Sequence, residues 1–437
     1  MILKPLIPKT AAIPDARPAR RPPPARISLL EPLRGPVFRS LWIASMASNI
    51  GTQMHNAGAG WQMTLLTSSP LLLGLVSVMA NAPVLFLSPL AGAVTDVSDR
   101  RHLLLTTQSL LAVAAGLLAL SAFGGWLNPK GLLVLIGMMG IASVFNQNCW
   151  STVVQDSVPR HHLPPAVSLN SISVNSARSL GPALAGLLIA WIGTGMVFLL
   201  NALSFLGVIF VINRWREPQE PARRKASSIG RAMKEGFLYL RSQRLLALLL
   251  IRHLLFITAG VSVVALLPLL AKTRLGLDAK GFGLLSSCFG MGAIVASMTA
   301  HSLAARFGIR HSTRAGMALS MSMLLAIAHV SNPVVAGGLM LLKGFSWTFI
   351  SLNHNVRVRM TAAPAFVGRV YSYYSMCATG GMALGGFLFG WLASLWGLTG
   401  AITAAAFLSL IALLLALRHP MPQIYREIET APEAPLP

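Results

Sequence analysis

Twelve apolar runs divide the sequence, and each is long enough to cross a membrane as a helix. A helix needs about 20 apolar residues to span the hydrocarbon core. The runs lie at residues 39–63, 70–92, 102–124, 131–156, 165–190, 194–213, 245–271, 281–303, 312–330, 333–356, 366–392 and 397–417. Their length favours helices over the shorter alternating strands of an outer-membrane barrel. Only 11% of the residues are charged, against roughly 25% in soluble proteins, so we predict an all-α membrane protein with twelve transmembrane helices.

Lysine and arginine are distributed unevenly along the chain, and this sets the expected orientation. The formal net charge of +23 would suggest nucleic acid as the partner of a soluble protein. In membrane proteins the same excess collects in cytoplasmic loops. With both termini in the cytoplasm, 28 of the 35 Lys and Arg residues lie on or at the edge of that side, three lie inside the runs, and four lie in outer loops, namely Lys130, Lys272, Arg274 and Lys280. We therefore predict a multi-pass protein of the cell membrane, the inner membrane in a bacterium, with cytoplasmic termini and no nucleic-acid partner.

Polar segments separate the runs into two sets of six. Residues 1–37 are rich in Pro, Ala and Arg and lack the continuous apolar core of a signal peptide. Within 214–244, Ile229, Met233 and Phe237 share one side of a possible helix, which fits an amphipathic helix or a solvated basic loop. The predicted domains are a disordered basic tail at 1–37, six-helix bundles at 38–213 and 245–418, a cytoplasmic linker with an amphipathic helix at 214–244, and a cytoplasmic tail at 419–437.

The connection between the second and third runs carries the most informative motif. It reads Gly92-Ala93-Val94-Thr95-Asp96-Val97-Ser98-Asp99-Arg100-Arg101. This resembles the loop between helices two and three of the major facilitator superfamily, G-x-x-x-D-(R/K)-x-G-[RK]-[RK], with departures at Val97 and Asp99. An Asp in place of the motif's glycine, as at Asp99, resembles the siderophore exporter branch, of the enterobactin type. The resemblance implies two pseudo-symmetric six-helix bundles that rock around a central cavity.

The same resemblance implies a gate that holds the two bundles together in one state. Its expected members are Gly92, Asp96, Arg100, Arg101, Asp156 and Arg369. Asp96 is expected to contact the start of helix 11 near Gly368 and Arg369, and Arg100 is expected to approach Asp156.

The fifth run contains a second motif, Gly181-Pro182-Ala183-Leu184-Ala185-Gly186, with Arg178 just before it. It resembles the helix-5 antiporter motif of drug exporters, G-P-x-x-G-G, with Ala185 replacing one glycine; a generic small-residue packing face is the alternative. A shift of 200 residues places Gly181 and Gly186 on Gly381 and Gly386, which fits two weakly similar repeats.

Polar side chains follow one face of the first run and the end of the fourth. Ser45, Asn49, Thr52, Asn56 and Gly60 recur at helical spacing, as do Gln147, Ser151 and Gln155. Such residues line a cavity or hydrogen-bond between packed helices. In the superfamily, helices 1, 4, 7 and 10 line the cavity. The expected cavity residues are Asn49, Thr52, His55, Asn56, Asn146, Gln147, Ser151, Arg252 and Lys343.

Charges deep inside the runs are basic, at Arg178, Arg252 and Lys343, and no acid lies near a membrane midplane. Arg252 is close enough to one end to snorkel instead. The chain has no phosphate-binding G-x-x-x-x-G-K-[ST] and no H-E-x-x-H, so we predict neither an enzyme nor a cofactor or metal site. Adjacent His161 and His162 are expected to be surface residues.

We expect a secondary transporter that couples efflux of drug- or siderophore-type small molecules to protons. His55, Asp96 or Asp156 would have to carry the proton, because no buried carboxylate is evident. An importer or facilitator of an anionic metabolite is the alternative, because a basic cavity suits anions. A membrane receptor that transports nothing is a third possibility.

Overall fold

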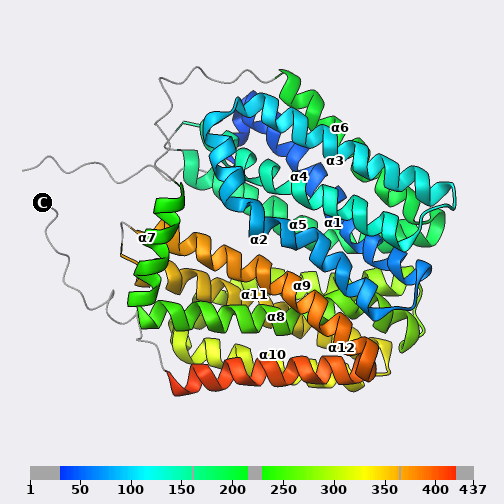
Figure 1. The fold of residues 1–437 in the computed structure, drawn as a ribbon, viewed down its shortest axis with the longest axis vertical. Coiled ribbons are helices and arrows are strands. Elements are labelled where there is room, and N and C mark those ends of the chain that lie inside the picture. The colour runs from blue at the N-terminus through cyan, green and yellow to red at the C-terminus, as the bar shows by residue number, and fades with distance from the viewer. Residues whose placement is uncertain (1–29, 160–161, 215–228, 364–365, 420–437) are drawn as a thin grey trace, which may run out of the picture.

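The computed structural model describes residues 30–159, 162–214, 229–363 and 366–419 (Figure 1). The side chains of three expected site residues, Asp96, Ser151 and Asp156, lie outside the described part, as do His161 and most of the two predicted tails. The elements are η1 (Glu31–Arg34), α1 (Pro36–Leu66), α2 (Pro70–Val97), α3 (Arg100–Phe123), α4 (Pro129–Asp156), α5 (Leu163–Ile192), α6 (Thr194–Arg214), α7 (Ile229–Ser242), α8 (Arg244–Thr273), α9 (Ala279–Phe307), α10 (Ile309–His329), α11 (Pro333–Thr361) and α12 (Val367–Arg418).

The long element α12 is two antiparallel helices joined at Gly397. There the backbone has φ 72° and ψ 176°, a left-handed conformation that glycine adopts without a steric penalty. Both ends of α12 lie near α7: Arg369 pairs with Glu235 of α7, and the carbonyl of His419 accepts a hydrogen bond from Arg252 near the start of α8. The chain therefore reverses at Gly397, between the predicted eleventh and twelfth runs.

With α12 counted as two, the described helices other than α7 number twelve, and the predicted fold class is confirmed. Eight helices of the described part are long and apolar enough to cross a membrane by composition alone. The remaining long helices are α1, α5 and α10.

Two bundles make up the molecule. In the first, α3 packs against α4 and α6, α1 against α5 and α6, and α2 against α4. In the second, α8 packs against α12, α9 against α11, and α10 against α11 and α12. Each bundle has its own apolar core, and one cluster of buried residues joins the two cores around Trp61 and Phe282.

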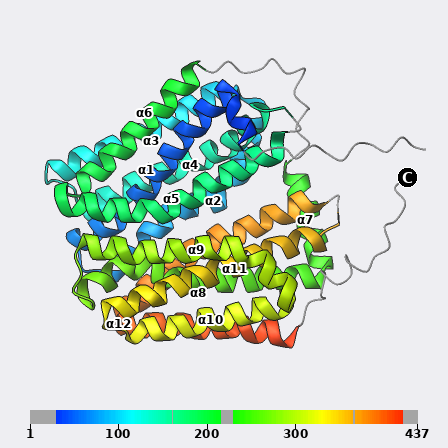
Figure 2. The ribbon, with the colours of Figure 1, turned by 180° about the vertical axis from the view of Figure 1, so that it is seen from behind.

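The bundles meet toward one end and diverge toward the other (Figure 2). We call the end that carries α7 the α7 end and the opposite one the far end. At the far end Trp61 of α1 stacks on Phe282 of α9, with ring centroids 5.5 Å apart. Lys272, in the last turn of α8, donates a hydrogen bond to the carbonyl of Thr64 at 2.6 Å. At the α7 end, the positions that a Cβ would take on Gly92 and Gly368 have no described atom within 4 Å.

Candidate functional site

The helix-5 motif lies where the two bundles touch. A Cβ on Gly186 would sit 2.7 Å from the carbonyl oxygen of Ala279 and 2.8 Å from the Cα of Gly283, both on α9. A Cβ on Gly181 would sit 2.5 Å from the Cβ of Gln53 on α1. Small residues allow such close backbone approach. The motif therefore packs α5 against its own bundle through Gly181 and against the other bundle through Gly186.

A second glycine contact joins α2 and α12. A Cβ on Gly74 would lie 2.1 Å from the carbonyl oxygen of Gly386 and 3.1 Å from the Cα of Gly390. Gly74 lies in the second turn of α2, and Gly390 precedes the reversal at Gly397, so this contact also belongs to the far-end half. Two pairs of helices, α5 with α9 and α2 with α12, thus close the far end by backbone contact.

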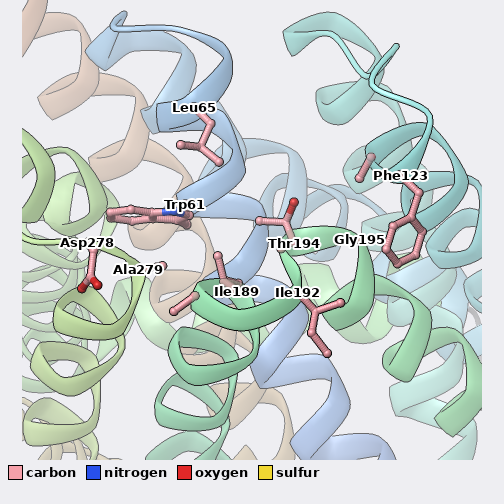
Figure 3. A pocket seen from close by; sticks show the side chains of 12 residues that line it. Trp61, Leu65, Phe123, Ile189, Ile192, Thr194, Gly195, Asp278 and Ala279 are labelled. Atoms are coloured by element: carbon pink, nitrogen blue, oxygen red, sulfur yellow. The ribbon is translucent and has the colours of Figure 1, made fainter.

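A pocket of about 530 Å³ opens beside this closure (Figure 3). Trp61 borders it, with Asp278 and Ala279 from the start of α9 on one side and Ile189 and Thr194 from the α5–α6 turn on the other. The Thr194 hydroxyl donates a hydrogen bond to the Gln62 side-chain oxygen at 2.5 Å. Asp278 accepts the backbone N–H of Gly281 and so caps α9. The Thr194 hydroxyl and one carboxylate oxygen of Asp278 are therefore hydrogen-bonded within the protein.

At the α7 end, Arg100, Arg101 and Arg369, which are expected gate residues, contact neighbouring helices. Arg101 of α3 donates hydrogen bonds to the carbonyls of Ile212 and Asn213 at the end of α6, the second at 2.9 Å. The carbonyl of Arg100 accepts the thiol of Cys149 on α4 at 3.4 Å. Arg369 of α12 forms an ion pair with Glu235 of α7 at 2.9 Å. Because the side chains of Asp96 and Asp156 lie outside the described part, the expected contacts of these two residues stay predictions.

Asp99, which departs from the motif's glycine, is the N-cap of α3. Its carboxylate accepts the backbone N–H of His102 at 2.9 Å and lies 3.1 Å from Nδ1 of the same residue. The N–H of His102 holds the pKa of the Asp99 carboxyl below its usual value, with the nearby imidazole acting in the same direction. The acidic side chain thus caps the first turn of α3 with a side-chain hydrogen bond that the motif's glycine could not make.

The polar stripe of α1 does not keep to one environment. The Asn49 amide donates to the hydroxyl of Ser173 on α5 at 3.1 Å. His55 is 3% exposed and packs against Phe198 of α6, with centroids 4.8 Å apart. Thr52 is half-buried and Asn56 is exposed. Asn49 and His55 therefore contact other helices of the first bundle, whereas Thr52 and Asn56 have accessible side chains.

The polar end of α4 is also divided. The Asn146 side-chain oxygen accepts hydrogen bonds from Gln108, at 3.1 Å, and from Thr107, both on α3. Gln147 is exposed. Asn146 thus joins two helices of one bundle, the packing alternative that the pattern of polar residues left open.

Of the three deep cations, Arg252 and Lys343 are buried, and their expected place in the substrate cavity stays a prediction. Lys343 is 0% exposed, and its ammonium donates to the hydroxyl of Ser320 on α10 at 2.6 Å, with the Phe256 ring centroid 5.7 Å away. Arg252 is 3% exposed and donates to the His419 carbonyl at 2.5 Å. Both find their partners inside the second bundle, because α8, α10, α11 and α12 surround them. Arg178 differs, since its side chain is exposed although its carbonyl lies beside Gly290 of α9.

A buried histidine pair in the second bundle was not among the site residues expected from the sequence. Nδ1 of His253 on α8 lies 3.3 Å from Nδ1 of His354 on α11, and His253 stacks on Tyr374 of α12 with centroids 4.2 Å apart. His253 directly follows Arg252, and His354 precedes Arg357 by one helical turn. That spacing of histidine and arginine on two helices was the available signal.

Two bundles of six helices that contact each other at one end and enclose buried cations define a transporter-like membrane protein. The chain belongs to the major facilitator superfamily, in the family described as transmembrane secretion effector, which matches residues 27–437.

Similar proteins include the staphyloferrin A transporter of Staphylococcus aureus (strain NCTC 8325 / PS 47), 24% identical over 57% of this chain and 63% of that protein. The macrolide efflux protein A of Streptococcus pyogenes is 21% identical over 54% of this chain and 58% of its own length. The chain thus spans less than two thirds of these two relatives. A multidrug resistance efflux pump PmrA homolog of Lactococcus lactis subsp. lactis (strain IL1403) is 24% identical over 68% of this chain and 72% of its own.

Solved structures show the fold over most of the chain. A bacterial homologue of the human lysosomal transporter Spinster, in an inward-facing and unoccupied conformation, has a TM-score of 0.71 at 12% identity, covering 89% of this chain and 97% of its own. The nucleoside transporter NupG has a TM-score of 0.68 at 14% identity, covering 87% of this chain and 98% of its own.

Proposed function

We propose that this protein is a secondary transporter that exports small molecules by alternating access, coupled to protons. The observation that carries the proposal is the asymmetry between the two ends. The far end is closed by backbone contacts between α5 and α9 and between α2 and α12, whereas Gly92 and Gly368 at the α7 end have no described neighbour within 4 Å of an added Cβ. A rocking motion of the two bundles would open the far end and close the α7 end.

The α7 end faces the cytoplasm in this proposal. The ends of α6, α8 and α12 there carry Arg214, Arg244 and Arg418, and the excess of Lys and Arg marks the cytoplasmic side of membrane proteins. The described state would then be open to the cytoplasm and ready to receive a molecule for export.

The gate at the α7 end would close when the bundles rock toward each other there. Arg369 would leave Glu235 for Asp96, and Arg100 would approach Asp156. The two contacts at Gly186 and Gly74 would separate at the same time and open the far end.

The substrate would be an anionic or oxygen-rich chelating molecule of the siderophore type, or a drug. The names of two relatives, a staphyloferrin A transporter and a macrolide efflux protein, support these two classes. Arg178 supports the first class, because its exposed cationic side chain favours anions and disfavours cations. The same side chain would also suit an importer or facilitator of an anionic metabolite, which is the second candidate.

Reconstituted vesicles test the proposal and its alternative. Export of a neutral dye should follow an imposed proton gradient, collapse when a protonophore removes the gradient, and be competed by anionic chelators more than by cationic drugs. Uptake of an anionic metabolite without dye export would favour the second candidate. Vesicles that move neither class in either direction would contradict transport itself.

A further inference from the structure

Four arginines gather inside the second bundle at the α7 end. Arg252 comes from α8, Arg310 and Arg314 from the first turns of α10, and Arg357 from the last turns of α11. The positive charges of Arg252, Arg310 and Arg314 all act on Arg357. We call these four residues the arginine cluster. Like charges held together in a low dielectric repel strongly, so the cluster needs a compensating negative group.

The end of α12 supplies part of this compensation. Arg314 donates to the carbonyl of Ala416 through Nε at 3.1 Å and through Nη2 at 2.8 Å, and Arg252 donates to the carbonyl of His419 at 2.5 Å. The last carbonyls of a helix carry a fractional negative charge of about −0.5 in total. This fractional charge is smaller than the charge of a single arginine, so it leaves most of the cluster's charge uncompensated.

Arg357 has an open hydrogen-bonding edge. Its side chain is 4% exposed, and neither Nε nor Nη2 has a hydrogen-bond partner among the described residues. These two nitrogens form one edge of the guanidinium, with parallel N–H bonds that match two oxygens of a carboxylate or phosphate. Nε of Arg252 and Nε of Arg310 also lack a described partner.

The described acids are engaged elsewhere. Glu235 pairs with Arg369, Asp99 and Asp278 cap α3 and α9, and Glu31 lies 3.9 Å from His162 in the first bundle. The nearby His253–His354 pair adds no negative charge, because imidazole is neutral or positive. Within the described part of the chain, therefore, no carboxylate neutralises the arginine cluster.

We propose that the arginine cluster binds a phosphate group, either from an anionic lipid headgroup or from a soluble phosphate. A tetrahedral phosphate offers oxygens to α8, α10 and α11 at once, whereas a carboxylate offers two in one plane. Arg310 and Arg314 are half-buried and provide the route to the buried fork of Arg357. Arg310, Arg314 and Arg357 lie in the terminal turns of α10 and α11 at the α7 end, which is the level of lipid headgroups in a membrane protein.

Thermal unfolding of the purified full chain tests this proposal. A ligand that binds the folded state raises the unfolding midpoint, by an amount that grows with the logarithm of the ratio of ligand concentration to Kd once the site is mostly occupied. One arm adds inorganic phosphate to protein in phosphatidylcholine nanodiscs, against sodium chloride of equal ionic strength. The other arm compares nanodiscs of phosphatidylcholine alone with nanodiscs that also contain phosphatidylglycerol. A rise with phosphatidylglycerol only would identify the lipid as the source, and a rise with inorganic phosphate would identify the soluble anion.

Two variants make the result specific. Arg357→Gln should weaken the apparent affinity by about tenfold or more, because it removes the bidentate edge. Arg306→Gln is the matched control. Arg306 is exposed in the last turn of α9 and lies over the Phe307 ring, so the unfolding midpoint of this variant should respond to phosphate and to phosphatidylglycerol as that of the wild type does. If Arg357→Gln does not fold, Arg310→Gln at the half-buried edge should show the same loss. A wild-type midpoint that changes in neither arm, or cluster variants that respond like Arg306→Gln, would overturn the proposal.

Discussion

Asp99 replaces the glycine of the loop motif and caps the helix that follows the loop. The carboxylate caps α3 through the His102 N–H, so its removal should loosen the first turn of that helix. Asp99→Ala should cost about 1 kcal/mol there, whereas Asp99→Asn, which keeps an acceptor, should cost less. Because folding lowers the pKa of Asp99, its charge-dependent stabilisation is present above the unfolded pKa and is lost as pH falls through the folded value. Hydrogen exchange at the start of α3, followed against pH, measures both effects.

Arg178 and Lys343 give opposite expectations for substrate charge. Lys343 is enclosed by its own bundle and bonded to Ser320, whereas Arg178 has an accessible side chain. Arg178→Met should weaken competition by anions several-fold, since an ion pair with an accessible cation is worth up to about 1 kcal/mol. Lys343→Met should leave that competition nearly unchanged, and Arg178→Lys should retain most of it.

Dye export in the presence of added anions and cations measures both variants. A strong effect of Lys343→Met with none from Arg178→Met would reverse the assignment and bring back the deep cavity cation that the sequence suggested. Competition led by cations in the wild type would instead favour a general drug pump.

At the scale of elements, the crossing of α5 and α9 is the contact that must open for release. A leucine at Gly186 would clash with the backbone of Ala279 and Gly283, so Gly186→Leu should hold the far end apart. We expect export to fall by about tenfold or more, since one of the two alternating states is lost. Gly207→Leu is the control, because Gly207 lies on an exposed face of α6 with no described atom within 4 Å of an added Cβ.

Spin labels at Leu65 and Lys280 report the far-end separation directly, because both side chains are exposed there. The three native cysteines, Cys149, Cys288 and Cys377, are replaced by serine for this measurement. A longer mean distance in Gly186→Leu than in Gly207→Leu is the expected result, and equal distances would argue against closure by this crossing.

For the whole molecule, Arg369 would pair with Glu235 when the α7 end is open and with Asp96 when it is closed. The relative strength of these two ion pairs would set the balance between the two states. Asp96→Asn should reduce transport while the protein remains folded and inserted, because the closed α7 end loses its proposed ion pair. Glu235→Gln should free Arg369 and favour closure at that end. The exposed Arg369–Glu235 pair itself contributes at most about 1 kcal/mol, so overall stability should change little.

Transport rates and label distances across the α7 end distinguish these two variants. Unchanged transport in Asp96→Asn would remove the proposed gate. A shift of both variants in the same direction would show that Arg369 does not alternate between the two acids.

The number and order of the spanning helices could be predicted from the sequence. The length of an apolar run is a local property, and it must match the thickness of the membrane's hydrocarbon core. Even the reversal at Gly397 lies where the eleventh run gives way to the twelfth. The partners of buried polar groups could not be predicted in this way. Lys343 meets Ser320 from another helix, and Arg252 meets His419, 167 residues away. Helix rotation and packing decide which neighbour each side chain faces, and these depend on contacts between distant segments rather than on spacing within one.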